Sequence, residues 1–145
     1  MTGNNILMVT PFFPPDFGGI AYHVLNITKN LVNLGNKISI IVPKNRNENN
    51  QSASFDYYDK IYRISSFYLQ GWPYPTLRSI SIPKDFGSQI ETIIQKGNFD
   101  IVHAHGHHYP FSWYALNAAK KSSPILATVK GSCLITNPSH YSPFP

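Results

Sequence analysis

The sequence contains little cysteine and few acidic residues. Among its 145 residues there is one cysteine, Cys133, and the Asp and Glu side chains together number 7. A single thiol excludes a disulfide framework within the chain and is typical of proteins from reducing compartments. Because Cys133 follows an apolar run, we interpret it as a small packed residue rather than a nucleophile.

Strong charge clustering is also missing. The formal net charge is +5, but the basic residues are scattered, and only Lys120 and Lys121 are adjacent. Proteins that bind nucleic acid usually carry a basic run or stripe. We therefore expect no nucleic-acid partner.

No apolar run approaches the ~20 residues that a membrane-spanning helix needs. The first residues, MTGNNILMVTPFFPPDFGG, also lack a positive start followed by a long apolar stretch, so they do not resemble a secretory signal. We expect a cytoplasmic protein that is at most peripheral at a membrane.

What the sequence does contain is an alternation of strand-like and helix-like segments. Hydrophobic residues make up 42% of the chain and charged residues 13%, which indicates one folded domain. Strands are expected at residues 5–10, 37–43, 60–65, 99–104 and 123–130, and helices at residues 20–34, 83–97 and 110–121. This order predicts an α/β fold, with a Rossmann-like parallel sheet of about five strands and helices on both faces. Residues 44–54 and 65–81 fall outside the alternation.

Four histidines, His103, His105, His107 and His108, fall within six positions. The string comes close to the His-x-His-x-Asp-His motif of metallo-β-lactamase-type hydrolases, with His107 in place of the Asp. Such sites need carboxylates to balance charge, and no Asp or Glu follows Asp100. A His-rich metallohydrolase therefore stays the less favoured alternative, and we expect no metal.

The predicted sheet brings three loops to one edge. His103 and His105 end the fourth strand, Gly18 and Gly19 follow the first strand directly before a helix, and residues 128–132 follow the fifth. Ligands of open parallel sheets bind beyond the carboxyl ends of the strands. The glycines let main-chain amides approach an anion at the helix N-terminus. Neither the G-x-G-x-x-G fingerprint nor a Walker loop is present.

Two stretches together resemble a known family. Residues 6–43, ILMVTPFFPPDFGGIAYHVLNITKNLVNLGNKISIIVP, and residues 99–132, FDIVHAHGHHYPFSWYALNAAKKSSPILATVKGS, are similar to the N-terminal, acceptor-side domain of family 4 retaining glycosyltransferases of the GT-B type. The resemblance implies transfer of a hexose-type sugar from a nucleotide-diphosphate sugar to an acceptor hydroxyl in glycan biosynthesis. It implies no cofactor and no metal.

The resemblance also assigns roles to residues. Gly18 and Gly19 match the loop that faces the donor diphosphate, and His105 matches the catalytic histidine near the transferred sugar. The residues assigned to the acceptor are Asp16, Tyr22, His103, His107, His108, Tyr109 and Lys130. Lys130 stands where many relatives have histidine. It either marks a changed acceptor that carries a phosphate or an acid, which we favour, or shows that this position is not essential.

The resemblance covers residues 1–145 as one domain. Nothing in this sequence matches the C-terminal domain that holds the nucleotide sugar in the family, so we expect a truncated chain that is inactive without a second domain or a partner subunit. The alternative from another class is a non-catalytic module that binds an acceptor or a partner. The acceptor is expected to be a glycan or a lipid-linked molecule, and the aromatic residues Phe67, Tyr68, Trp72 and Tyr74, with Arg78, are interpreted first as a cover for one side of the sheet, with peripheral contact with a membrane as the second hypothesis.

Overall fold

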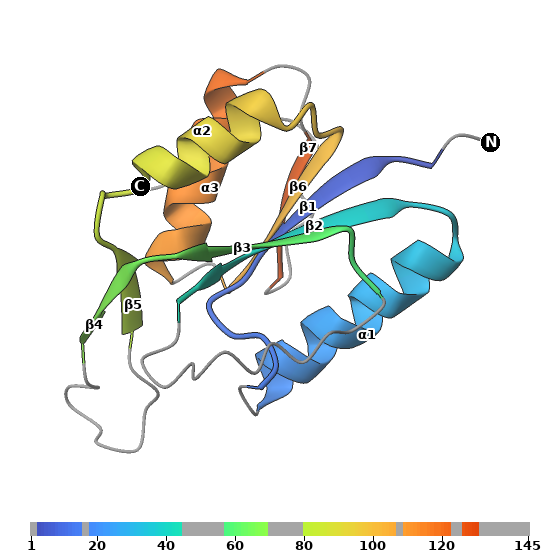
Figure 1. Ribbon diagram of the computed structural model, residues 1–145, viewed down its shortest axis with the longest axis horizontal. Helices are drawn as coiled ribbons and strands as arrows, with labels where there is room; N and C mark the ends of the chain where they lie inside the picture. The colour runs from blue at the N-terminus through green and yellow to red at the C-terminus, as the bar shows by residue number, and fades with distance from the viewer. Residues whose placement is uncertain are drawn as a thin grey trace.

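The computed structural model describes residues 3–15, 18–44, 57–69, 80–106 and 109–122, and the main chain of residues 126–130. These residues form three helices and seven strands (Figure 1). The helices are α1 (Gly19–Asn33), α2 (Ser88–Lys96) and α3 (Pro110–Lys121). The strands are β1 (Asn5–Val9), β2 (Lys37–Pro43), β3 (Lys60–Ile64), β4 (Ser66–Leu69), β5 (Ile80–Pro83), β6 (Ile101–His105) and β7 (Leu126–Lys130).

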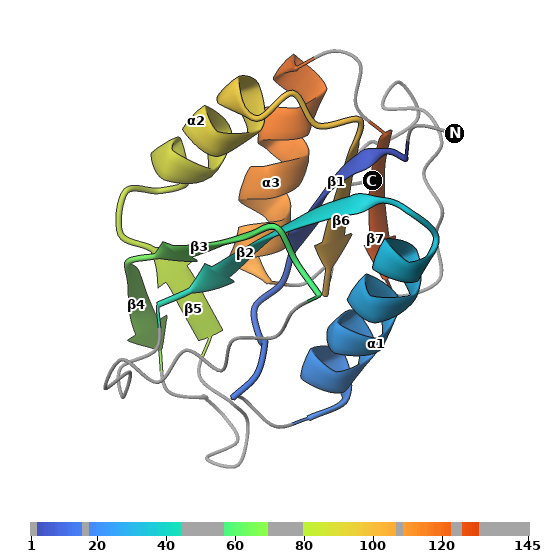
Figure 2. The ribbon, with the colours of Figure 1, turned by 45° about the vertical axis from the view of Figure 1, so that its right-hand side comes forward.

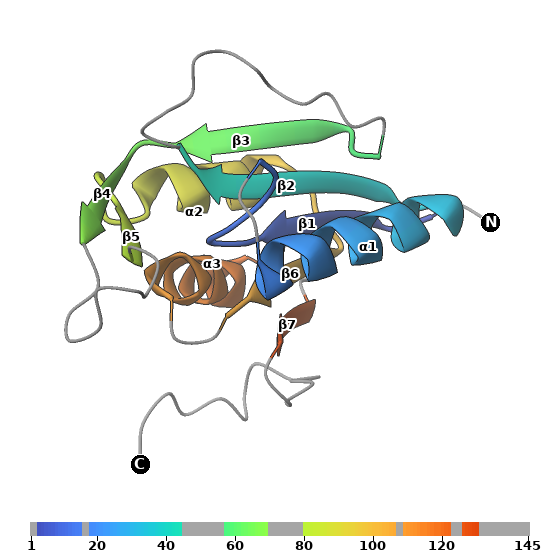
Figure 3. The same cartoon turned by 90° about the horizontal axis from the view of Figure 1, so that it is seen from below.

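Five of these strands form one parallel sheet in the order β3-β2-β1-β6-β7. Seen from below, the strands follow one another from β3 at one edge to β7 at the other (Figure 3). The sheet confirms the predicted α/β class, including the five expected strands. The order reverses direction at β1, because β2 and β3 lie on one side of β1 while β6 and β7 lie on the other.

Helices cover both faces of the sheet, with α1 on one face and α2 and α3 on the other (Figure 2). Because side chains alternate along a strand, β1 serves both layers. Ile6 and Met8 pack with Val24 of α1, whereas Leu7 and Val9 belong to the core beneath α2 and α3. Each fully buried aliphatic side chain of this kind contributes roughly 1.5–3 kcal/mol to folding.

Helix α1 stops where its sequence predicts. Gly35 takes a φ of 86°, a conformation that favours glycine, and its N–H donates to the Val32 carbonyl at 2.8 Å. The N–H of Asn36 donates to the Leu31 carbonyl at 3.1 Å, so the carbonyls of both Leu31 and Val32 in the last turn have partners.

The predicted start of the second helix is wrong. Pro83 is the last residue of β5, and α2 begins at Ser88. The intervening turn contains two positive φ values, 51° at Phe86 and 93° at Gly87, which a helix does not contain. The Asp85 carboxylate accepts a hydrogen bond from the N–H of Gln89 at 2.9 Å and so caps the first turn of the shortened helix.

A second, two-stranded sheet forms where no regular structure was expected. Strands β4 and β5 pair antiparallel, with Phe67 opposite Ile82. Figure 1 shows this small sheet beyond the carboxyl end of β3, beside α3. Trp72, Tyr74 and Arg78, for which packing on the sheet and contact with a membrane were the two hypotheses, lie outside the described residues.

Candidate functional site

The site lies at the reversal of strand order between β1 and β6. Val9 of β1 pairs with Ala104 of β6, so the two strands end side by side. The segment after β1 leads to Gly18 at the start of α1, and β6 ends at His105. A crevice for ligands commonly lies at such a switch point in an open α/β sheet.

The two glycines at the start of α1 differ in what they require. Gly18 has φ 139° and ψ 170°, a region that is nearly closed to residues with a Cβ. A Cβ placed on Gly19 would meet nothing within 4 Å. Gly18 is therefore required by the backbone, whereas Gly19 leaves open space at the first helical N–H groups.

Histidines from two elements meet at the end of β6. His103 and His105 lie on the same face of the strand, and their rings stack with centroids 4.3 Å apart and 24° between the planes. The ring of His23, from the second turn of α1, meets His105 edge-on at 5.8 Å. The His105 side chain is fully buried, and the His103 side chain is partly buried.

The environment keeps His103 neutral. Burial, and after it the neighbouring His23, lowers the pKa of His103 from 6.5 to about 4. A neutral imidazole has one donor and one acceptor nitrogen, so His103 can hydrogen-bond a hydroxyl at neutral pH without presenting a positive charge.

The end of β6 is held by α3. The Ser112 hydroxyl, which is buried, donates to the His105 carbonyl at 2.7 Å. Gly106 follows with φ 75°, and a Cβ there would collide with the Tyr109 ring. The Tyr109 N–H donates to the Gly106 carbonyl at 3.0 Å, and its ring meets Phe12 edge-on at 5.4 Å. Tyr109 thus joins the turn after β6 to the segment after β1.

The structure brings together some of the predicted site residues. Gly18, Gly19, His103, His105 and Tyr109 lie around the ends of β1 and β6, and Tyr22 lies in the first turn of α1 with its side chain 54% exposed. The main chain of Lys130 lies opposite His105 in the β6–β7 register. Asp16, His107 and His108 lie outside the described residues.

Three participants were missed at the sequence level. His23 sits one helical turn after Gly19, and this spacing places it near the same edge as the glycines. Ser112 acts through a hydrogen bond from its hydroxyl to a main-chain carbonyl, and Gly106 acts through its positive φ. A single sequence offers no signal for either.

Two features are absent from the part of the chain that the structure describes. No group of three or more His, Cys, Asp or Glu side chains there could hold a metal ion. No described helix combines the length and apolar character needed to cross a bilayer.

Comparison with known proteins gives one finding. The model of the protein family described as Glycosyltransferase Family 4 matches residues 17–144. No curated protein matches the chain. The matched residues include the start of α1 and all of β6.

Proposed function

Because the chain belongs to glycosyltransferase family 4, we propose that it is the acceptor-side domain of a retaining glycosyltransferase. In this reaction a hexose-type sugar moves from a nucleotide-diphosphate sugar to an acceptor hydroxyl, and the anomeric configuration is kept. The glycosyltransferase class follows from the family, and the structure supports the finer assignment through one contact in particular.

That contact is the one between His23 and His105. It joins the helix that begins at Gly18 and Gly19 to the carboxyl end of β6, with ring centroids 5.8 Å apart. A phosphate at the start of α1 and a sugar ring beside the histidines would therefore be neighbours. A nucleotide-diphosphate sugar needs such neighbours, because its diphosphate is bonded directly to the sugar.

The start of α1 is suited to the diphosphate. The first N–H groups of a helix have no partners within the helix, and the helix dipole favours negative charge there. No acidic residue lies in the first turn of α1 to oppose an anion. The open space at Gly19 lets phosphate oxygens approach the main chain closely. As the bond to the sugar breaks, these amides would stabilise the charge on the departing diphosphate.

The histidines are suited to the sugar. His103 stays neutral at physiological pH and can hydrogen-bond sugar hydroxyls. His105 exposes no side-chain surface, so its predicted contact with the sugar requires the rings packed against it to shift when substrate binds. We assign His105 the catalytic position and His103 a supporting one.

A second domain completes the proposal. Transfer depends on holding donor and acceptor in one cleft. In the proposed enzyme the nucleotide is held by a C-terminal domain or a partner subunit that faces the edge formed by Gly18 and His105. The 145-residue chain alone is then expected to show no turnover.

The test joins this chain to the C-terminal domain of a family 4 glycosyltransferase. The fusion is incubated with a panel of nucleotide-diphosphate hexoses and hydroxyl acceptors, and the release of nucleoside diphosphate is followed. We expect release with the fusion but not with either half, and His105→Ala should lower it by about a hundredfold or more. Lys96→Gln serves as the control. Lys96 is exposed and lies at the end of α2, near the amino ends of the sheet strands and away from the site. A folded fusion that releases nothing, or full activity in His105→Ala, would contradict the proposal.

A further inference from the structure

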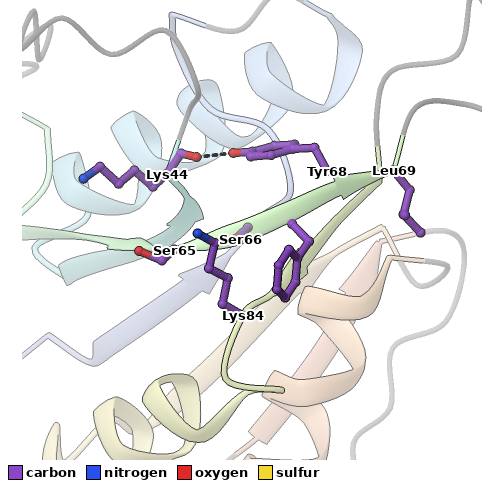
Figure 4. A pocket seen from close by; sticks show the side chains of 7 residues that line it. Lys44, Ser65, Ser66, Tyr68, Leu69 and Lys84 are labelled. Carbon is purple, nitrogen blue, oxygen red and sulfur yellow. Dashed lines mark hydrogen bonds between the residues drawn. The ribbon is translucent and has the colours of Figure 1, made fainter.

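An open hollow of about 640 Å³ lies at the corner between β3 and β4, apart from the histidines. Figure 4 shows the side chains around it. It is lined by Lys44, Ser65, Ser66, Phe67, Tyr68, Leu69 and Lys84. We call it the β4 hollow. No residue of this lining is acidic, so two ammonium groups set its charge.

The two lysines reach this corner through a shared main-chain arrangement. Lys44 follows β2 and Lys84 follows β5, and each comes directly after a proline in the similar strings IVPK and SIPK. The N–H of Lys44 donates to the Ile64 carbonyl at 2.8 Å, and that of Lys84 donates to the Ser65 carbonyl at 2.9 Å. The carbonyls of Ile64 and Ser65, which are adjacent at the end of β3, thus hold the main chain of two lysines that are far apart in the sequence.

Further contacts hold the lining in place. The Tyr68 hydroxyl donates to the Lys44 carbonyl, and the Lys84 ammonium lies over the Phe67 ring, 5.6 Å from its centroid. Within the described part of the chain, neither Lys44 nor Lys84 forms an ion pair with a carboxylate. Among the described residues, no carboxylate therefore competes with an anion for these two charges.

The other end of the hollow is apolar. Phe67 and Leu69 are 53% and 55% exposed, and Ile80, which pairs with Leu69, is 39% exposed. In the view of Figure 4 the two ammonium groups and the Ser65 hydroxyl lie toward one end and Leu69 lies at the opposite end. Exposed apolar side chains that gather beside cations suit a ligand with a charged head and an apolar chain.

We propose that the β4 hollow binds the phosphate group of a lipid phosphate. Lys44 and Lys84 contact the phosphate oxygens, the Ser65 hydroxyl donates a hydrogen bond, and the exposed faces of Phe67 and Leu69 contact the first part of the apolar chain. Lysine suits this role because its ammonium is a compact charge that binds phosphate without demanding one geometry.

The hollow lies on the same edge of the sheet as the histidines. Lys44 and Ser65 follow the carboxyl ends of β2 and β3, and three strand spacings separate β3 from β6. At ~4.8 Å per spacing, this is about 14 Å. A lipid phosphate in the hollow could thus carry a sugar hydroxyl toward His105. Only this last step rests on the proposed function, because binding in the hollow is measurable without sugar transfer.

The experiment titrates the 145-residue chain with dihexanoyl phosphatidic acid below its micelle concentration, followed by calorimetry. Inorganic phosphate and dihexanoyl phosphatidylcholine are titrated in parallel, the first to test phosphate alone and the second to test the chains without net charge. We expect phosphatidic acid to bind, with phosphate weaker and phosphatidylcholine weaker still.

Matched variants locate the binding. Lys44→Gln with Lys84→Gln should weaken phosphatidic acid binding about tenfold or more. Lys37→Gln with Lys96→Gln removes the same amount of charge near the amino ends of the strands, away from the hollow. This variant should leave the affinity unchanged. Leu69→Ser, an exposed change, should weaken phosphatidic acid but not inorganic phosphate. Circular dichroism confirms that each variant folds.

Three outcomes would overturn the proposal. They are no binding of phosphatidic acid by the wild-type chain at millimolar concentration, equal losses in both double-lysine variants, and equal affinity for inorganic phosphate and the lipid. If phosphatidic acid binds as expected but the fusion enzyme transfers no sugar, the β4 hollow is supported as a lipid phosphate site and the proposed function is wrong.

Discussion

The Ser112 hydroxyl donates a 2.7 Å hydrogen bond to the main-chain carbonyl of His105. Both residues are fully buried, and they join the first turn of α3 to the last residue of β6. The helix that follows the candidate site thus fixes the strand that carries it.

We predict that Ser112→Ala lowers the free energy of unfolding by about 1 kcal/mol, because the buried carbonyl loses a partner that water cannot replace. Ser88→Ala is the matched control, since the Ser88 hydroxyl makes a similar bond to the Asp85 carbonyl at an exposed position. Urea denaturation of the two variants measures the difference. Equal losses in the two variants would show that burial does not increase the contribution of the Ser112 hydrogen bond to the free energy of unfolding.

A second prediction concerns acid. The pKa of His103 falls to about 4 in the folded chain, from 6.5 when unfolded. Between these values the unfolded state binds a proton that the folded state does not. Stability should therefore be unaffected by this group above pH 6.5, should decrease as the pH falls from 6.5 to 4, and should reach a plateau below that.

The loss across this window should be about 3 kcal/mol, because a pKa difference of one unit corresponds to about 1.4 kcal/mol. Denaturation of the wild type and of His103→Gln at a series of pH values isolates the contribution of His103, because the variant lacks the titrating ring. A chemical-shift titration that places the His103 pKa near 6.5 would contradict the prediction.

The glycine pair gives a third prediction, in which the two substitutions act differently. Gly18→Ala should destabilise the fold by about 1–3 kcal/mol, because its φ of 139° strains any residue with a Cβ. Gly19→Ala should leave stability within about 1 kcal/mol of the wild type, because the added methyl meets no atom within 4 Å.

If phosphate binds at the start of α1, Gly19→Ala should nevertheless lower sugar transfer by the fusion enzyme by roughly tenfold or more, since the methyl occupies the approach to the amides. Thermal denaturation and the nucleoside diphosphate assay separate the two effects. Unchanged transfer in a stable Gly19→Ala variant would place the diphosphate elsewhere.

The fourth prediction concerns Thr28 of α1. Its side chain is fully buried, and its Oγ1 makes no hydrogen bond to any residue that the structure describes. Thr28→Val replaces the hydroxyl with a methyl of similar shape, so we expect the free energy of unfolding to rise by about 1 kcal/mol.

Thr92→Val on α2 is the control for Thr28→Val. The Thr92 hydroxyl is exposed and donates to the Ser88 carbonyl at 2.9 Å, so the same change there should bring no gain. Thermal denaturation of both variants measures the change in stability at each position. A gain at both positions would show that valine itself, rather than removal of a buried hydroxyl, is responsible.

The central sheet was predictable because its strands are continuous apolar runs. Met8 and Leu7 face opposite layers, both of them fully buried, and only a strand covered on both sides needs apolar residues at consecutive positions. The small β4–β5 sheet was not predictable in this way. Its strands are four residues long, and Phe67 and Leu69 are exposed on one face, so their pattern does not differ from that of a loop.

The site was predictable in position but not in detail. The glycines and histidines could be placed at one edge because strand ends meet there in any parallel sheet. The burial of His105 depends on packing with His23, which comes from another element. Likewise, Pro83 suggested a helix start, but it is the last residue of β5, and a turn with positive φ at Phe86 and Gly87 follows before α2 begins at Ser88.

The pairing of β1 with β6 has a consequence for synthesis on the ribosome. Asn5, at the start of β1, bonds Asp100, which is 95 residues away. At about 5–20 residues per second, β1 waits roughly 5–20 s after its own synthesis before its second neighbour has been made. During that time β2 is the only partner of β1 that has been made, and the other side of β1 is open to pairing with foreign chains. Nascent chains of this protein should therefore depend on chaperones until β6 has been made.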